Sequence, residues 1–149
     1  MFGVRRLSIV ATILTIVAAF MGSYVRGKNA GLACPDWPLC HGRLIPPLEG
    51  LILLEWGHRM LVLFLSLIIV AILVQCWWQR RPERWVATGV FVLLIVQAVL
   101  GGITVLIRLD PWVVAIHQGM ALVFFGSLVV LTVLTLQSGD RQQQTRFSV

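Results

Sequence analysis

The chain has 149 residues, of which 58% are hydrophobic and only 12% are charged. A soluble domain carries about 25% charged residues, so this composition excludes an ordinary water-soluble protein and indicates an integral membrane protein in a lipid membrane. The net charge of +6 could suggest nucleic-acid binding, but the basic residues flank the apolar runs, which is the pattern of a membrane protein, and we expect no nucleic-acid partner.

Four apolar runs predict the fold class, an all-α integral membrane protein. The runs cover about 7–25, 51–78, 85–107 and 112–136, and each meets the roughly 17–25 residues that a spanning helix needs. We therefore expect a four-transmembrane-helix bundle that forms a single membrane domain over residues 1–149. The first run is longer than the apolar part of a signal peptide, so we expect a retained first span. One sizeable loop remains, at about 26–50.

The orientation follows from the distribution of basic residues. One set of flanking segments holds seven of them: Arg5, Arg6, Arg80, Arg81, Arg84, Arg141 and Arg146. The other set holds four: Arg26, Lys28, Arg43 and Arg108. Positive charge marks the cytoplasmic side, so both termini are expected in the cytoplasm. The sequence has no mitochondrial transit signature, and a prokaryotic plasma membrane is the simplest location.

The loop at 26–50 is expected to lie outside and to be ordered by its prolines. Cys34 and Cys40 flank a Pro-x-x-Pro segment, on the oxidising side of the membrane where disulfides persist. We expect these two cysteines to form a disulfide that orders the loop, with two free thiols as the alternative. A structural zinc site would need four ligands, and no fourth candidate lies near Cys34, Cys40 and His41.

The second apolar run contains Glu55, His58 and Arg59. A charged side chain inside a span costs about 2.5–3.5 kcal/mol on insertion scales, so it normally faces the protein interior and has a function. Glu55 and His58 are three residues apart and therefore share one helix face. His117, in the fourth run, is the other histidine in an apolar span.

The two histidines lie at matched depths, roughly 11 Å and roughly 8 Å from the starts of their runs at 1.5 Å per residue. Both runs lead inward from the outer side, so His58 and His117 can face each other across the bundle. Two opposed imidazoles without further ligands suit a six-coordinate haem iron. A di-iron site would need carboxylates from the other helices as well. The alternative is that each histidine only hydrogen-bonds a neighbouring helix.

Small and basic residues accompany the histidines toward the outer side. Gly22, Gly101 and Gly102 would let a flat macrocycle approach the backbone, although ordinary helix packing explains them equally well. Three arginines lie where haem propionates would point, and we name them as candidate cofactor-binding residues: Arg59, Arg26 and Arg108.

Four motifs occur in an order that resembles haem A synthase. Residues 31–42 read GLACPDWPLCHG, then Glu55-x-x-His58-Arg59, Gln97-x-x-Leu100-Gly101-Gly102 and His117 follow. The resemblance implies an oxidoreductase that converts a methyl group of haem O into the formyl group of haem A. It implies a haem b cofactor with His58 and His117 as ligands of the haem iron, and Glu55 as the catalytic residue, acting as a general base or positioning water. Haem O synthase is the implied donor, and a terminal oxidase or its assembly factors the acceptor.

The chain departs from the family pattern in length. Typical members have eight spans in two similar halves, one for the cofactor haem and one for the substrate haem, whereas this chain has one half. We therefore expect a homo-oligomer, with a dimer slightly preferred.

Two other functions fit parts of the pattern. A b-type cytochrome that only transfers electrons would use the same two histidines. A four-helix thiol-quinone oxidoreductase would use the outer cysteine pair, but it needs a reactive Cys-x-x-Cys relay, and Cys34 and Cys40 are six apart.

Overall fold

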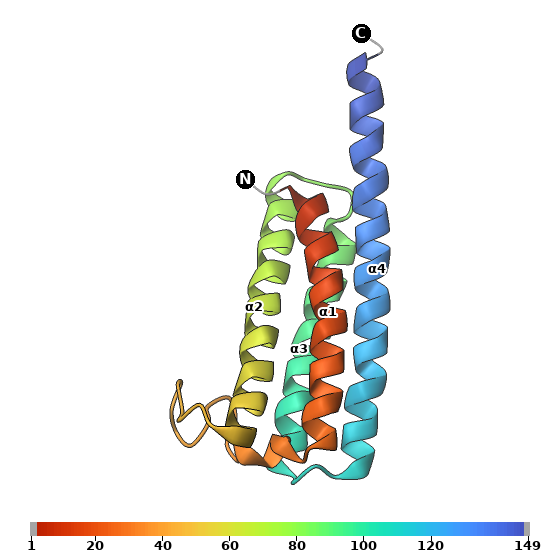
Figure 1. Ribbon diagram of the computed structural model, residues 1–149. Coiled ribbons are helices and arrows are strands. Elements are labelled where there is room, and N and C mark those ends of the chain that lie inside the picture. Colours follow the sequence, from red (N-terminus) through yellow and green to blue (C-terminus); the bar gives the residue numbers. More distant parts are fainter. Residues whose placement is uncertain (1–2, 148–149) are drawn as a thin grey trace.

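The computed structural model describes the backbone of residues 3–147 and the side chains of residues 3–138. Four helices run alternately up and down beside one another (Figure 1). They are α1 (Val4–Gly27), α2 (Gly50–Trp78), α3 (Arg84–Leu106) and α4 (Pro111–Phe147). A short helical turn, η1 (Ala30–Ala33), lies in the long loop between α1 and α2.

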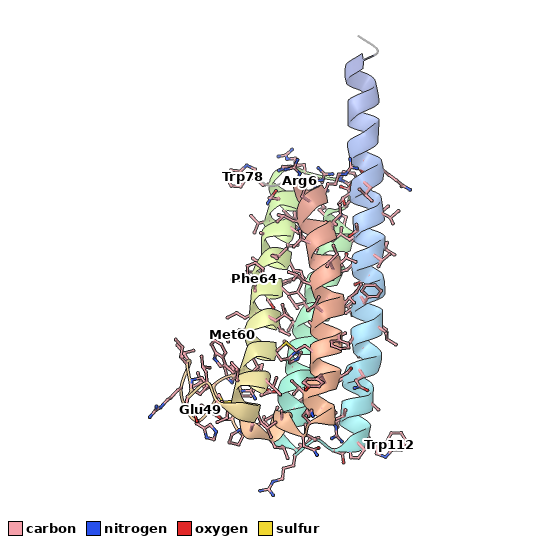
Figure 2. The ribbon with its side chains drawn as sticks, viewed as in Figure 1. Arg6, Glu49, Met60, Phe64, Trp78 and Trp112 are labelled. Carbon is pink, nitrogen blue, oxygen red and sulfur yellow. A yellow bond between two sulfur atoms is a disulfide. The ribbon has the colours of Figure 1, made fainter. Side chains whose placement is uncertain are left out.

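Each of the four helices contains a segment long and apolar enough to cross a membrane. The four expected apolar runs coincide with these helices, and the predicted all-α four-helix fold class is confirmed. The start of α1 and the end of α4 lie at one end of the bundle, which we call the inner end. Figure 2 shows Arg6 and Trp78 at this end, and Glu49 and Trp112 at the opposite, outer end, which carries the long loop.

The close-packed apolar core occupies the inner half of the bundle. Its members come from the first part of α1 and α3 and from the second part of α2 and α4, which meet at the inner end because the helices alternate in direction. They are Val4, Ala11, Leu65, Ile68, Ile69, Ile72, Cys76, Ala87, Val90, Leu94, Phe124, Leu128 and Leu131. Interior packing of this kind, with large side chains at near-zero exposure, fixes how the helices sit against each other.

The outer half is packed differently. Among the described residues, α2 has no buried apolar side chain before Leu65, and α4 has none before Phe124. In this half the buried side chains of α1 and α3 include Val25, Thr104 and Val105, whereas α2 contributes the charged side chain of Glu55, at 5% exposure. The outer parts of α2 and α4 are therefore not held together by a shared apolar core.

Polar contacts secure the bundle elsewhere. The hydroxyl groups of Thr12 and Thr132 are 2.9 Å apart and join α1 to α4. At the inner end, Ser138 of α4 donates a hydrogen bond to Glu83, which also pairs with Arg81 at 3.2 Å. Burial raises the pKa of Glu83, but the hydrogen bonds from Ser138 and from the surrounding backbone, together with Arg81, outweigh it and hold the pKa below its usual value.

We predict that Leu128→Ala lowers the thermal stability of the protein in detergent, because Leu128 is completely buried in the inner core. Truncating a buried leucine leaves a cavity and costs about 2 kcal/mol or more. Leu122→Ala is the matched control in the same helix, because Leu122 is 73% exposed. Thermal unfolding midpoints of the two variants check this; equal midpoints would contradict the assigned core.

Candidate functional site

His58 and His117 both lie in the outer half, each against a glycine of the preceding helix. The imidazole of His58 in α2 packs on Gly22 of α1, where an added Cβ would lie 3.1 Å from the ring carbon Cε1. The imidazole of His117 in α4 packs on Gly101 of α3, where an added Cβ would lie 3.2 Å from Cε1. Both distances are shorter than an ordinary contact, so a larger residue at either position would require the imidazole to move by a few tenths of an ångström.

The bundle thus contains the same arrangement twice, a glycine of one helix supporting a histidine of the next. The pair α1–α2 contributes Gly22 and His58, and the pair α3–α4 contributes Gly101 and His117. Repeated arrangements of this kind are common in membrane folds.

The ring nitrogens indicate what the two histidines can bind. The Nδ1 atoms of His58 and His117 are buried, and neither has a hydrogen-bond partner among the described residues. A buried polar atom without a partner costs about 1–3 kcal/mol, so such atoms mark places with a functional reason. The described residues include no group of three or more His, Cys, Asp or Glu side chains that could hold a metal ion alone.

This donor set fits haem iron, because the porphyrin supplies four ligands and the protein needs only two imidazoles. Both rings are backed by a bare glycine backbone, and both lie where the inner apolar core has ended. The residues present are therefore suited to a flat, bis-imidazole-ligated group, and unsuited to a metal held by protein ligands alone.

Gln97 of α3 fixes the helix that carries His117. Its side-chain Nε2 donates a hydrogen bond of 3.1 Å to the main-chain carbonyl of His117. Its Oε1 is buried and has no partner among the described residues. Gln97 lies one turn from Gly101 on the same helix, so both residues of α3 act on the same residue of α4.

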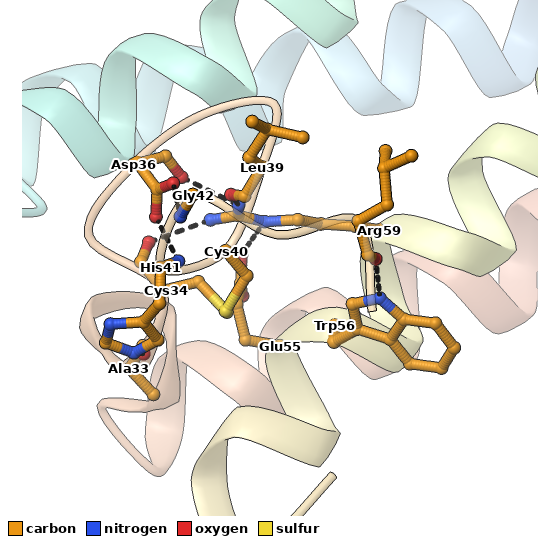
Figure 3. Close-up of a disulfide and its surroundings, with 11 residues drawn as sticks. Ala33, Cys34, Asp36, Leu39, Cys40, His41, Gly42, Glu55, Trp56 and Arg59 are labelled. Atoms are coloured by element: carbon orange, nitrogen blue, oxygen red, sulfur yellow. Dashed lines mark hydrogen bonds and ion pairs between the residues drawn. A yellow bond between two sulfur atoms is a disulfide. The ribbon is translucent and has the colours of Figure 1, made fainter. Parts of the chain in front are cut away.

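Glu55 and Arg59 form a buried ion pair at the outer end of α2. Arg59 Nε donates to Glu55 Oε1 at 2.6 Å, and the two side chains are only 10% and 6% exposed. The same guanidinium reaches the long loop, as Figure 3 shows. There it donates to the carbonyl oxygens of Asp36 at 2.7 Å, of Cys34 at 2.9 Å, and of Leu39. Four of its five N–H groups are thereby used.

The long loop is closed by the expected disulfide between Cys34 and Cys40, which is present in the structure. The carboxylate of Asp36 accepts hydrogen bonds of 2.7 Å from the backbone N–H groups of both His41 and Gly42. The Gly42 bond is the main reason that the pKa of Asp36 is lowered, and His41 and the charge of Arg59 lower it further. The disulfide and the hydrogen bonds to Asp36 therefore both hold the disulfide-closed ring of residues 34–40 in place.

Three further contacts attach the loop to the bundle. The indole of Trp37 lies on Gly102 of α3, where an added Cβ would come within 2.7 Å of the ring. Gly31 faces the side chain of Leu109, in the turn between α3 and α4. Further along the loop, Trp56 of α2 donates a hydrogen bond of 2.8 Å to the carbonyl oxygen of Leu44.

The two remaining candidate arginines lie at the outer end of the bundle. Arg26, in the last turn of α1, donates to the side chain of Asn29 at 3.1 Å. Arg108 is exposed in the turn between α3 and α4, in a left-handed conformation with φ 56°. Both are cations close to the outer surface, where anionic groups of a ligand would be near water.

Comparison with known proteins identifies the family. Residues 5–52 and 49–148 match the COX15-CtaA family, whose description is cytochrome oxidase assembly protein. The chain belongs to this family.

Curated relatives in the family are named heme A synthase. The relative from Bacillus pumilus is 30% identical over 142 residues, which cover 92% of this chain and 46% of the relative. The relative from Symbiobacterium thermophilum is 34% identical over 133 residues, covering 85% of this chain and 42% of the relative. That from Staphylococcus saprophyticus is 33% identical over 158 residues, covering 97% and 50% respectively. The chain therefore spans about half the length of these relatives.

Some contacts of this family member were not predicted from its sequence. The spacing of four between Glu55 and Arg59 is the spacing of a helical ion pair, and this signal could have predicted their contact. The bonds from Arg59 to three loop carbonyls have no such signal, because backbone oxygens are present in every sequence. The contact between Trp37 and Gly102 joins residues 65 positions apart, and no local pattern relates them.

Proposed function

We propose that the protein is a haem A synthase, which oxidises a methyl group of haem O to the formyl group of haem A for the assembly of terminal oxidases. Family membership supports the activity, and one structural observation supports the site. That observation is the pair of glycine-backed imidazoles of His58 and His117, with buried and unpaired ring nitrogens, in the outer half of the bundle. In this proposal a haem b cofactor is held by His58 and His117 as iron ligands.

Protein side chains cannot oxidise an unactivated methyl group, so bound haem would supply the redox chemistry. The chain's own residues would bind, orient and move protons. Gly22 and Gly101 clear the backbone behind the ligating rings, and Gly102 lies next to Gly101 on α3. Arg26 and Arg108 would meet the propionates near the outer surface, and Arg59 has one N–H left for such a contact.

Glu55 is proposed as the catalytic residue. Its Oε1 accepts the hydrogen bond from Arg59, so its carboxylate has a fixed orientation three residues from His58 on the same helix face. The other oxygen, Oε2, accepts no hydrogen bond from the described residues. That oxygen could accept a proton from water or hold the water beside the substrate edge.

The proposal includes a location and partners. The excess of arginine at the inner end supports a cytoplasmic position for that end in a prokaryotic plasma membrane. The disulfide loop would then face the extracytoplasmic, oxidising side. Haem O synthase would supply the substrate, and a terminal oxidase or its assembly factors would receive the product.

We predict that His58→Ala and His117→Ala each abolish or strongly reduce the low-spin haem spectrum, because each removes one of two iron ligands. His41→Ala is the control, since His41 lies in the loop and its ring contacts the carbonyl of Ala33 at 2.9 Å. Optical spectra and haem content of the purified variants check this. Wild-type spectra in both helix variants would show that the ligands are elsewhere.

We predict that Glu55→Gln retains haem but loses haem A formation. Glutamine keeps an oxygen that can accept the hydrogen bond from Arg59 and removes the proton-accepting charge. The measurement is haem extraction and chromatography after co-expression with a haem O synthase. Undiminished haem A in the variant would exclude Glu55 from the chemistry. Absence of haem A from the wild type, with a normal haem b spectrum, would instead favour a plain electron-transfer cytochrome.

The proposal also includes the association of two or more copies of the chain. One copy provides one pair of imidazoles, whereas a cofactor haem and a substrate haem together need two pairs. Two copies would supply eight helices, and symmetric dimers are the commonest assembly of identical chains.

We therefore predict a homo-oligomer, with a dimer preferred over larger rings. Native mass spectrometry of the active, haem-loaded protein in mild detergent gives the number of chains and of haems per complex. A strictly monomeric preparation that still produced haem A would refute this prediction.

A further inference from the structure

In the outer half of the bundle, the two histidine-bearing helices α2 and α4 contribute no buried apolar side chain among the described residues. The apolar core ends at Leu65 in α2 and begins at Phe124 in α4, on the inner side of His58 and His117. The relative position of α2 and α4 at that level therefore depends on contacts other than a shared apolar core. The long loop is the structure that lies across this end.

The first attachment of the loop is electrostatic and is made to α2. The guanidinium of Arg59 donates to three carbonyl oxygens, those of Cys34, Asp36 and Leu39, and all three belong to the disulfide-closed ring 34–40. Glu55 balances its charge at 2.6 Å. A buried guanidinium whose donors are nearly all used is held firmly, because releasing the ring would leave buried charge and carbonyls unpaired.

The second attachment is apolar and is made to α3. Trp37 belongs to the same disulfide-closed segment 34–40, and its indole lies against Gly102. A Cβ added at Gly102 would come within 2.7 Å of the indole. Gly102 directly follows Gly101, which supports the ring of His117. Similarly, Arg59 directly follows His58. Each attachment is therefore one residue away from a residue that sets the position of one imidazole.

We infer that the ring 34–40 is a strap, and that Arg59 and Trp37 are positioning residues that set the orientation of the His58 and His117 imidazoles relative to each other. The ring is short and covalently closed, so a displacement at one attachment is passed to the other. This inference rests on the proposed function only in that bound haem reports the orientation of the two rings.

The test uses variants that release one attachment at a time in the full-length protein. Gly102→Ala displaces Trp37 and keeps the Arg59 side chain and its donor groups. Gly89→Ala is its matched control in α3, because an added Cβ at Gly89 meets no atom within 4 Å. Arg59→Lys keeps the charge beside Glu55 but cannot reproduce the fork of donors. Its control is Arg43→Gln, since Arg43 is an exposed cation of the same loop.

The first readout is electron paramagnetic resonance of the oxidised haem protein, because the g values of bis-imidazole haem depend on the angle between the imidazole planes. We expect Gly102→Ala and Arg59→Lys to shift the g values of the haem that each variant retains, while both controls give the wild-type spectrum. A variant that only destabilised the fold would lose haem without shifting the spectrum of what remains.

The second readout does not need haem. Amide hydrogen exchange in the haem-free protein should be about tenfold or more faster over residues 31–43 in both test variants, and unchanged in both controls, because local opening exposes these amides. Faster exchange with unchanged g values would show that the loop is attached as described but does not position the imidazoles, and would overturn the inference. Unchanged exchange would show that there is no strap. If wild type showed no bis-imidazole spectrum, the proposed function would fail, and the exchange result would still decide whether the attachments exist.

Discussion

The central constraint in this protein is that two imidazoles on different helices, those of His58 and His117, each lie against a glycine backbone in the outer half of the bundle. Side chains that packed tightly there would cover them. The molecule meets this constraint by dividing its length, with a close-packed apolar core at the inner end and glycine-supported histidines beyond it. The apolar core and the candidate site are therefore built from different residues of the same four helices. For example, α2 contributes Leu65 to the core and His58 to the site.

The two helix pairs share the contact between a glycine and a histidine, but the side chains around the two histidines differ. Four residues before Gly101 on α3 lies Gln97, which binds the carbonyl of His117. The equivalent position before Gly22 on α1 is Ala18, which is buried and has no polar side chain. On the other side, Glu55 precedes His58 by three residues, whereas Val114 precedes His117. Each histidine thus has its own surroundings, and a group held between them would have two different faces.

Hydropathy was enough to predict the helices, because a spanning helix needs only length and apolar composition. Cysteine spacing and compartment predicted the disulfide, and glycines near the histidines indicated close approach. The loop contacts could not be predicted in the same way. Arg59 remains a candidate for a propionate, and in addition three of its donors bind loop carbonyls. Gly102 remains a candidate for contact with a macrocycle, and in addition it lies against Trp37. Both outcomes depend on how the loop folds over the helices, which no local pattern encodes.

The hydrogen bond from Trp56 to Leu44 holds part of the long loop against the side of α2. Trp56 is six residues into α2, about 9 Å from the helix start, and the bond holds Leu44 at this level. Leu44 and Ile45 are 77% and 70% exposed, beside a helix whose outer surface is also apolar. At this level of a membrane-spanning bundle these two side chains would face the boundary between headgroups and acyl chains, where indole rings also concentrate. The segment that follows the disulfide would then contact lipid on one side and water on the other, so the lipid composition at this surface would be part of its environment.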